Sequence, residues 1–235
     1  IEDVPFPAHV VYPGATPEII ANLREILAPR HFGNKPQDLL LSFHSFLVQT
    51  TKHNILVDAC CGNNKQRPTR PAWHMQNGPF LENLSSVGVT PEQVDFVLCT
   101  HLHADHIGWN TKLENGQWTP TFPKAQYLFS EIEFNYWNTL HNSMQKEPIL
   151  YGAYEDSVLP VIESGQATLV KENHMIETGV FLEPAFGHTP GNVIAHVSDN
   201  GSHAVLSGDV IHHPVQLIHP EWSTNFCINS EESRI

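Results

Sequence analysis

Short apolar runs bounded by turn residues are the main pattern in the first half of the chain. Leu39–Val48 and Asn54–Ala59 predict two strands joined by a polar turn. Pro79–Val87 predicts a helix, and Val94–Cys99 and Gln126–Phe129 predict two further strands. Strands that alternate with helices are typical of an α/β fold.

The rest of the pattern adds two helices and a series of closely spaced strands. Pro17–Leu27 has apolar residues at helical spacing within residues 1–38, a proline-rich segment that we expect to form an N-terminal arm or lid. Ser130 and Glu133 have the spacing of a capping box and predict a helix that begins after Ser130. The second half reads as a β-sheet segment, with short strands at Ala167–Val170, Val180–Pro184, Val193–Val197 and Ala204–Leu206.

Composition limits the classes of function. The chain has 235 residues, 40% of them hydrophobic, which suffices for a single domain with a substantial core. No stretch approaches the roughly 20 consecutive apolar residues of a transmembrane helix, so we expect no membrane partner. The formal net charge of −13 argues against a broad nucleic-acid-binding surface, which depends on Lys and Arg.

The cysteines and the first residues bear on the cellular compartment. Cys60, Cys61, Cys99 and Cys227 show no paired C-x-x-C spacing, and we interpret them as buried or free thiols. The chain starts at Ile1 without the basic and apolar regions of a leader. We expect a cytoplasmic protein, and a periplasmic or secreted protein after leader removal is the open alternative.

A dense group of candidate metal ligands follows the predicted strand Val94–Cys99. His101, His103, Asp105 and His106 lie close together in the sequence. If strand geometry continues, His101 and His103 emerge on one side and can bind one ion through neutral imidazole nitrogens. Asp105 and His106 on the following turn suit a second ion of the zinc, iron, manganese or cobalt type. The alternative is a set of scattered surface or capping residues.

Two later loops carry further donors at the ends of predicted strands. His188 lies in the sequence G-H-T-P-G, and Asp209 ends the sequence S-G-D. His188 could complete a three-histidine site, and Asp209 could bridge two ions with its two oxygens. Taken alone, His188 could be a turn residue and Asp209 a helix cap.

Other histidines lack the spacing of metal ligands. We expect them to be ordinary core or surface residues: His44, His53, His74, His141, His174, His196 and His203.

The motifs H-x-H-x-D-H, G-H-T-P-G and S-G-D, in this order, resemble the metallo-β-lactamase superfamily over about residues 39–213. The sequences at Thr100–Thr111, Pro120–Pro123 and Gly208–Pro214 are similar to its lactonase-like and methyl-parathion-hydrolase-like members. The resemblance implies an α/β fold of the four-layer αββα sandwich type. It also implies that residues 39–235 are a metallo-β-lactamase-like domain that lacks its last C-terminal elements.

The resemblance assigns one set of ligands to each of two ions and one further residue that binds both ions. Six residues would hold the ions: His101, His103 and His188 the first, Asp105 and His106 the second, and Asp209 both. Asp58 is similar to the strand-end aspartate that supports the family's metal loop.

The family's further histidine ligand would come from beyond the end of this chain. We interpret His212, His213 and His219, which follow Asp209, as substrate-facing or structural.

The resemblance implies a dinuclear metal-dependent hydrolase with two divalent ions, which we expect to be Zn²⁺, with Fe, Mn or Co as alternatives. A metal-bridging hydroxide would cleave an ester or lactone, such as an N-acyl homoserine lactone, with Asp105 and Asp209 as catalytic residues and Asp105 also passing a proton. β-Lactam, thioester or phosphotriester hydrolysis are alternatives, because substrate choice depends on pocket shape. A non-catalytic metal-binding protein is an alternative of another class.

The expected partner is a small molecule, and the N-terminal arm would permit a homodimer. An uncharged, partly hydrophobic substrate is favoured if aromatic side chains line the site. The candidates, most of which we expect in the core, are Phe43, Trp73, Trp109, Phe122 and Trp137.

Overall fold

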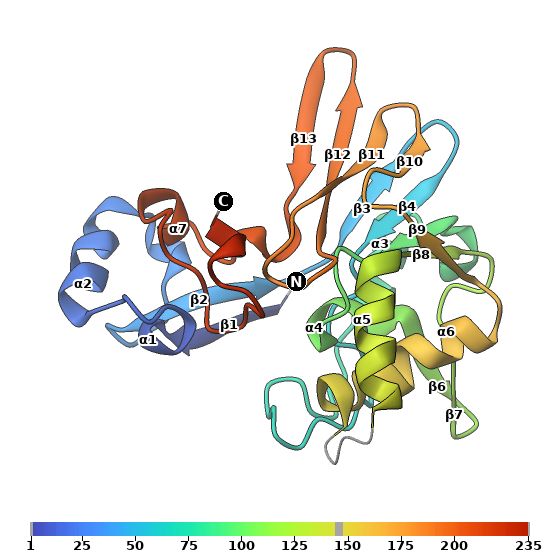
Figure 1. Cartoon of the computed structure of the whole chain (residues 1–235), viewed down its shortest axis with the longest axis horizontal. Coiled ribbons are helices and arrows are strands. Elements are labelled where there is room, and N and C mark those ends of the chain that lie inside the picture. Colours follow the sequence, from blue (N-terminus) through green and yellow to red (C-terminus); the bar gives the residue numbers. More distant parts are fainter. Residues whose placement is uncertain (1, 144–147, 235) are drawn as a thin grey trace. The chain divides into compact units, whose positions relative to one another are not determined.

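The computed structural model describes residues 2–143 and 148–234, so the ends of the expected domain ranges, Ile1 and Ile235, lie outside it. The chain forms two compact units, residues 1–43 with 175–235 and residues 44–174. Both units contain helices and strands (Figure 1), which confirms the expected α/β class. Among the described residues, none of the helices has the length and apolar character needed to cross a membrane.

Residues 44–174 are built on a five-stranded sheet. In spatial order its strands are β3 (Phe46–Gln49), β4 (Asn54–Val57), β5 (Phe96–Leu98), β8 (Gln126–Ser130) and β9 (Ala167–Val170). β3 pairs antiparallel with β4, and the other neighbours are parallel. The loops after β4 and β5 therefore leave the same edge of the sheet, where loops of parallel sheets form sites.

Helices and a hairpin complete this unit. They are α3 (Phe80–Ser86), α4 (Ala104–Ile107), α5 (Glu131–Asn142), α6 (Leu159–Glu163), and the hairpin of β6 (Thr111–Glu114) and β7 (Gln117–Pro120). A hydrophobic core includes Val97 and Tyr127 from the sheet together with Phe122 and Trp137. Phe122 and Trp137 thus have the core role expected of most aromatic candidates.

A buried polar network lies in the same unit. Arg67 donates from both guanidinium ends to the two carboxylate oxygens of Asp156, at 2.7 and 2.8 Å. Lys65 is fully buried and donates to Thr111 Oγ1 at 2.6 Å, with its ammonium 3.5 Å from the centre of the Trp118 ring. Burial is the main reason that the pKa of Lys65 falls to about 7.

The other unit begins with the N-terminal segment. β1 (Glu2–Pro7) pairs antiparallel with β2 (Asp38–Phe43), and α1 (Ala8–Val11) and α2 (Pro17–Ile26) lie between them in sequence. Thr16 caps α2, since its side chain accepts from the backbone N–H of Ile19. Side chains of this segment form a second hydrophobic core with Val215 of α7 (Val215–Ile218).

The predicted strand Leu39–Val48 is wrong as a single element. The chain leaves strand geometry at His44 and Ser45, so its two halves are β2 and β3. β2 pairs with β1, whereas β3 pairs with β4 in a different sheet. The apolar pattern runs through this break because both strands carry apolar side chains, and pattern alone does not show a change of partner.

A four-stranded antiparallel sheet completes the unit. Its strands in order are β10 (Met175–Glu177), β11 (Val180–Pro184), β12 (Val193–Asp199) and β13 (Ser202–Leu206), with β12 and β13 forming the hairpin drawn in orange in Figure 1. Val180, Leu182, Val193 and Ala195 are buried. The alternate positions form an outer face that includes polar side chains, as expected for an antiparallel sheet.

Candidate functional site

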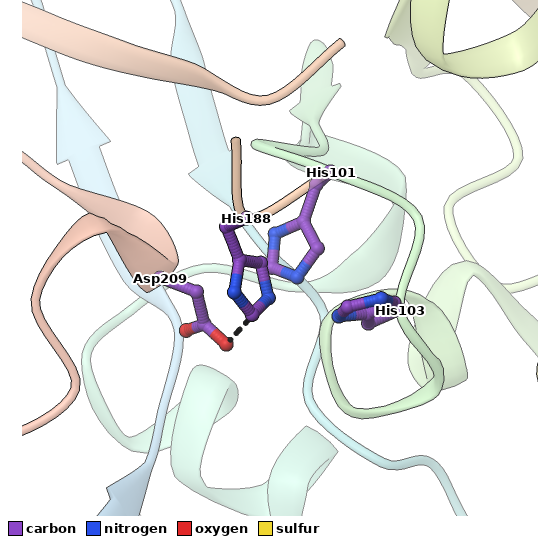
Figure 2. A group of neighbouring side chains, drawn as sticks. All are labelled: His101, His103, His188 and Asp209. Carbon is purple, nitrogen blue, oxygen red and sulfur yellow. Dashed lines mark ion pairs between the residues drawn. The ribbon is translucent and has the colours of Figure 1, made fainter. Parts of the chain in front are cut away.

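The predicted ligand loop follows β5 directly. His101 and His103 lie on the loop itself, and Asp105 and His106 lie on α4 (Figure 2 shows His101 and His103). The ring centroids of His101 and His103 are 4.7 Å apart, and those of His101 and His106 are 4.1 Å apart. Because β5 already ends at Leu98, the loop and not strand alternation brings these rings together.

Asp58, at the end of β4, orients His106. Its Oδ2 lies 2.9 Å from His106 Nδ1, and Oδ1 accepts from the backbone N–H of Thr100 at 2.8 Å. With the proton on Nδ1, His106 has its Nε2 lone pair available for a ligand. Asp105 Oδ2 lies 3.7 Å from that Nε2. One imidazole and one carboxylate are thus presented side by side.

The segment that follows β4 and the segment that follows α4 approach each other so closely that a side chain has no room between them. A Cβ on Gly108 would lie 2.0 Å from the carbonyl carbon of Cys61. Gly108 donates its N–H to Cys60 at 2.7 Å, and Ala59 donates to the carbonyl of His106 at 2.6 Å. These bonds fix α4 against the end of β4.

Glu133 of α5 supports the loop from another direction. Its carboxylate is buried and accepts from the backbone N–H of Leu102, between the two histidines, at 3.0 Å, and from Trp137 Nε1 at 2.6 Å. Ser130 caps the helix through Glu133 N, as predicted. The Glu133 side chain, expected to bond back to the cap, binds the ligand loop and Trp137, and these two donors satisfy its buried carboxylate.

The other unit brings His188 and Asp209 together. His188 Nε2 lies 3.2 Å from Asp209 Oδ2, the ion pair drawn as a dashed line in Figure 2. His212 Nε2 lies 3.1 Å from the same oxygen. Burial lowers the pKa of His188, but the Asp209 carboxylate more than offsets this and the pKa rises to about 9.

Sequence reasoning missed the role of Cys227. Its Sγ lies 3.4 Å from His188 Nδ1 and 3.4 Å from the hydroxyl of Ser233, which donates to it. The C-terminal segment also donates from Ile228 N to the carbonyl of His188, at 2.9 Å. A cysteine 39 positions from its histidine leaves no local signal in the sequence.

Two of the three histidines after Asp209 have structural roles. His213 is 2% exposed; its Nε2 donates to the carbonyl of His31 at 2.7 Å and its Nδ1 accepts from Val215 N at 3.2 Å. His219 stacks on Trp222 with ring centroids 4.3 Å apart. All four cysteines are free thiols, as predicted.

Each unit therefore gathers part of the predicted ligand set. His101, His103, Asp105 and His106 come together in residues 44–174, and His188 and Asp209 come together in the other unit. Imidazole nitrogens with carboxylate oxygens are the donors that zinc and related borderline dications take in proteins. The chemistry of both donor sets fits such ions.

Comparison with protein families gives one match. Residues 42–228 match the model of the metallo-beta-lactamase superfamily. No curated protein matches the chain.

Solved structures give the same fold. A probable metal-dependent hydrolase from Staphylococcus aureus matches with a TM-score of 0.77 and 19% identity, covering 99% of this chain and 78% of that chain. AidC, described as a dizinc quorum-quenching lactonase, matches with a TM-score of 0.76 and 19% identity, covering 99% of this chain and 77% of that chain. The hydrolase AbOPH matches with a TM-score of 0.75 and 23% identity, covering 99% and 76%. The expected fold is thereby confirmed.

Proposed function

The chain belongs to the metallo-β-lactamase superfamily of metal-dependent hydrolases, and from that premise we propose that it is a dinuclear hydrolase that cleaves a small ester or lactone. One observation carries the proposal. In each unit a histidine nitrogen and a carboxylate oxygen lie together at the positions of the family's motifs, His106 with Asp105 at 3.7 Å and His188 with Asp209 at 3.2 Å. Imidazole and carboxylate donors at all the motif positions together suit two dications.

The proposed ligand set follows the family motifs residue by residue. His101, His103 and His188 would hold one ion, Asp105 and His106 would hold the other, and Asp209 would bridge both. The contacts of Asp58 with His106 and of Cys227 with His188 support this assignment, because ligating histidines are held through their other ring nitrogen.

Bound dications supply an activated water at neutral pH and polarise the scissile carbonyl. The chain's own residues orient the metal ligands and transfer protons. Asp105, on α4 beside His106, would take a proton from the attacking water as its oxygen bonds to the carbonyl carbon, and would pass it to the leaving oxygen as the C–O bond breaks. The Cys227 thiol beside His188 Nδ1 keeps that imidazole in one orientation. Neither role requires a serine or cysteine nucleophile.

The substrate class is part of the proposal. Structures of the same fold include proteins described as N-acyl homoserine lactone hydrolases. An N-acyl homoserine lactone is therefore the first substrate to test. A β-lactam, a thioester and a phosphotriester complete the panel. A small-molecule substrate also fits the strongly negative net charge, which disfavours nucleic acid.

Metal content and turnover test the proposal together. Protein purified without chelator should hold two ions per chain, identified by elemental analysis as zinc or as iron, manganese or cobalt, and should hydrolyse one member of the panel. Asp209→Ala should lose metal and abolish turnover. The matched control is His219→Ala, which removes a histidine that stacks on Trp222 and should leave both quantities unchanged.

Two results would contradict the proposal. Full activity of Asp209→Ala with unchanged metal content would remove the bridging role. Bound metal without turnover of any substrate would favour the non-catalytic metal-binding alternative.

A further inference from the structure

A second pair of imidazoles lies on the outer face of the β10–β13 sheet. His196 Nδ1 of β12 lies 3.0 Å from His203 Nε2 of β13. The strand register pairs His196 with Val205 and Ser198 with His203, so the two histidines are diagonal neighbours on one face. The antiparallel register, and not sequence spacing, creates this pair.

The nitrogens that point away from the pair also have polar neighbours. Glu183 Oε2 lies 2.8 Å from His196 Nε2, and Ser198 Oγ lies 2.7 Å from His203 Nδ1. Phe181, directly opposite His196 on β11, stacks on its ring with centroids 4.6 Å apart and planes within 3°. Both rings are thus fixed in the orientation that turns one nitrogen of each toward the other.

We propose that His196 and His203 form a separate surface site for one divalent transition-metal ion. Two nitrogens that bind one ion with bonds of about 2.0–2.1 Å lie about 2.9 Å apart at a right angle and about 3.4 Å apart at a tetrahedral angle. The observed separation of 3.0 Å falls in that range. The ion sits between the two imidazoles, and water completes its coordination.

The surroundings match those of metal-bound histidines. A ligating histidine commonly has a carboxylate or similar acceptor beside its other ring nitrogen, and Glu183 lies beside His196 Nε2 and Ser198 beside His203 Nδ1. The Glu183 side chain is 56% exposed and His203 is exposed, so an ion and its waters have access. The net charge of −13 favours the approach of a cation.

The donor set selects the class of ion. Two imidazoles suit Cu²⁺, Ni²⁺ and Zn²⁺, with Cu²⁺ bound most tightly, and do not suit Mg²⁺ or Ca²⁺, which require oxygen ligands. Neither histidine belongs to the proposed hydrolytic centre, so this site and that centre can be tested independently.

Copper titration of the metal-loaded full chain tests the proposal. Cu²⁺ is added to wild type, His203→Ala and the control His219→Ala, and electron paramagnetic resonance reports the nitrogens coordinated to copper. Elemental analysis of the same samples reports any exchange of the ions already bound. Because His203 is exposed, its replacement should leave the fold intact, which circular dichroism checks.

Wild type and His219→Ala should bind one more copper ion per chain than His203→Ala, with splitting from two imidazole nitrogens. The affinity of this ion should fall at least about tenfold in His203→Ala. Equal copper binding by wild type and His203→Ala would overturn the proposal and leave a hydrogen bond between neutral rings as the reason for the short distance. Splitting from only one nitrogen would overturn it as well.

Discussion

The Sγ atom of Cys227 and the Oδ2 atom of Asp209 hold the His188 ring from opposite sides. Sγ lies 3.4 Å from Nδ1, and the carboxylate oxygen lies 3.2 Å from Nε2. With an ion bound, the sulfur would accept a hydrogen bond from Nδ1–H and leave the Nε2 lone pair for the ion, so a residue of the C-terminal segment would fix the tautomer of a proposed ligand.

Replacing Cys227 should therefore weaken metal binding. Cys227→Ala removes the acceptor at Nδ1, and we expect the affinity for the ion at His188 to fall about 10- to 100-fold. Cys227→Ser is the matched control, since its hydroxyl can accept the same hydrogen bond from Nδ1–H and should retain most of the affinity. Competition with a chromophoric chelator measures both. Equal affinities of Cys227→Ala and wild type would show that the thiol does not position the ring.

Glu133 should contribute to stability through the ligand loop. Glu133→Gln replaces a buried charged acceptor of Leu102 N and Trp137 Nε1 with a neutral one. We expect a loss of about 1.5–3 kcal/mol in the free energy of unfolding, measured by urea denaturation. Glu131→Gln, an exposed position in the first turn of the same helix, should change it by less than about 0.5 kcal/mol. Similar losses in both variants would contradict this role.

The close approach at Gly108 should not tolerate a side chain. Gly108→Ala places a methyl group 2.0 Å from the Cys61 carbonyl carbon, and backbone must move to accommodate it. We expect a loss of at least about 2–3 kcal/mol by urea denaturation. Gly116→Ala, in the open β6–β7 turn, carries only the cost of a positive φ, about 1 kcal/mol. Equal losses of unfolding free energy in the two variants would mean that the segments around Gly108 and Cys61 move apart easily.

Lys65 should make stability depend on pH. The unfolded lysine keeps its proton up to a pKa of about 10.5, whereas burial lowers the pKa of the folded group to about 7. Between these values the unfolded chain binds more protons, so raising the pH stabilises the folded state, by up to about 1.4 kcal/mol per pH unit. Below about pH 7 this contribution no longer changes.

Urea unfolding of wild type and Lys65→Met at pH 7, 8 and 9 checks the sign. The wild type should gain stability relative to Lys65→Met as the pH rises. Lys112→Met, which leaves Lys65 in place, should keep the wild-type dependence. Parallel curves for wild type and Lys65→Met would contradict the lowered pKa.

The sequence predicted those features that depend on neighbours in the chain. His101 to His106 form one continuous motif, and the short strands and α2 follow from local periodicity and capping. The break at His44 and Ser45 could not be predicted, because both halves have the same apolar character and differ only in the strand with which they pair.

Contacts between segments far apart in the chain could not be predicted from the sequence pattern. Cys227 reaches His188 only because the C-terminal segment returns to the His188 loop. His196 and His203 were assigned as ordinary residues from their spacing, and their proximity depends on the register of β12 and β13. The register of two strands and the path of the C-terminal segment are tertiary properties, and the spacing of residues along the sequence does not determine them.

Asp58, Glu133 and the backbone bonds around Gly108 hold the loop of His101 to His106 in place. We expect these contacts to keep the loop folded when metal is removed, in contrast to small zinc domains that unfold without metal. One ion would then leave and another enter the proposed centre while the loop keeps its conformation. Its occupancy would follow the supply of metals around the protein, and we expect preparations from different growth media to carry different ions on the same fold.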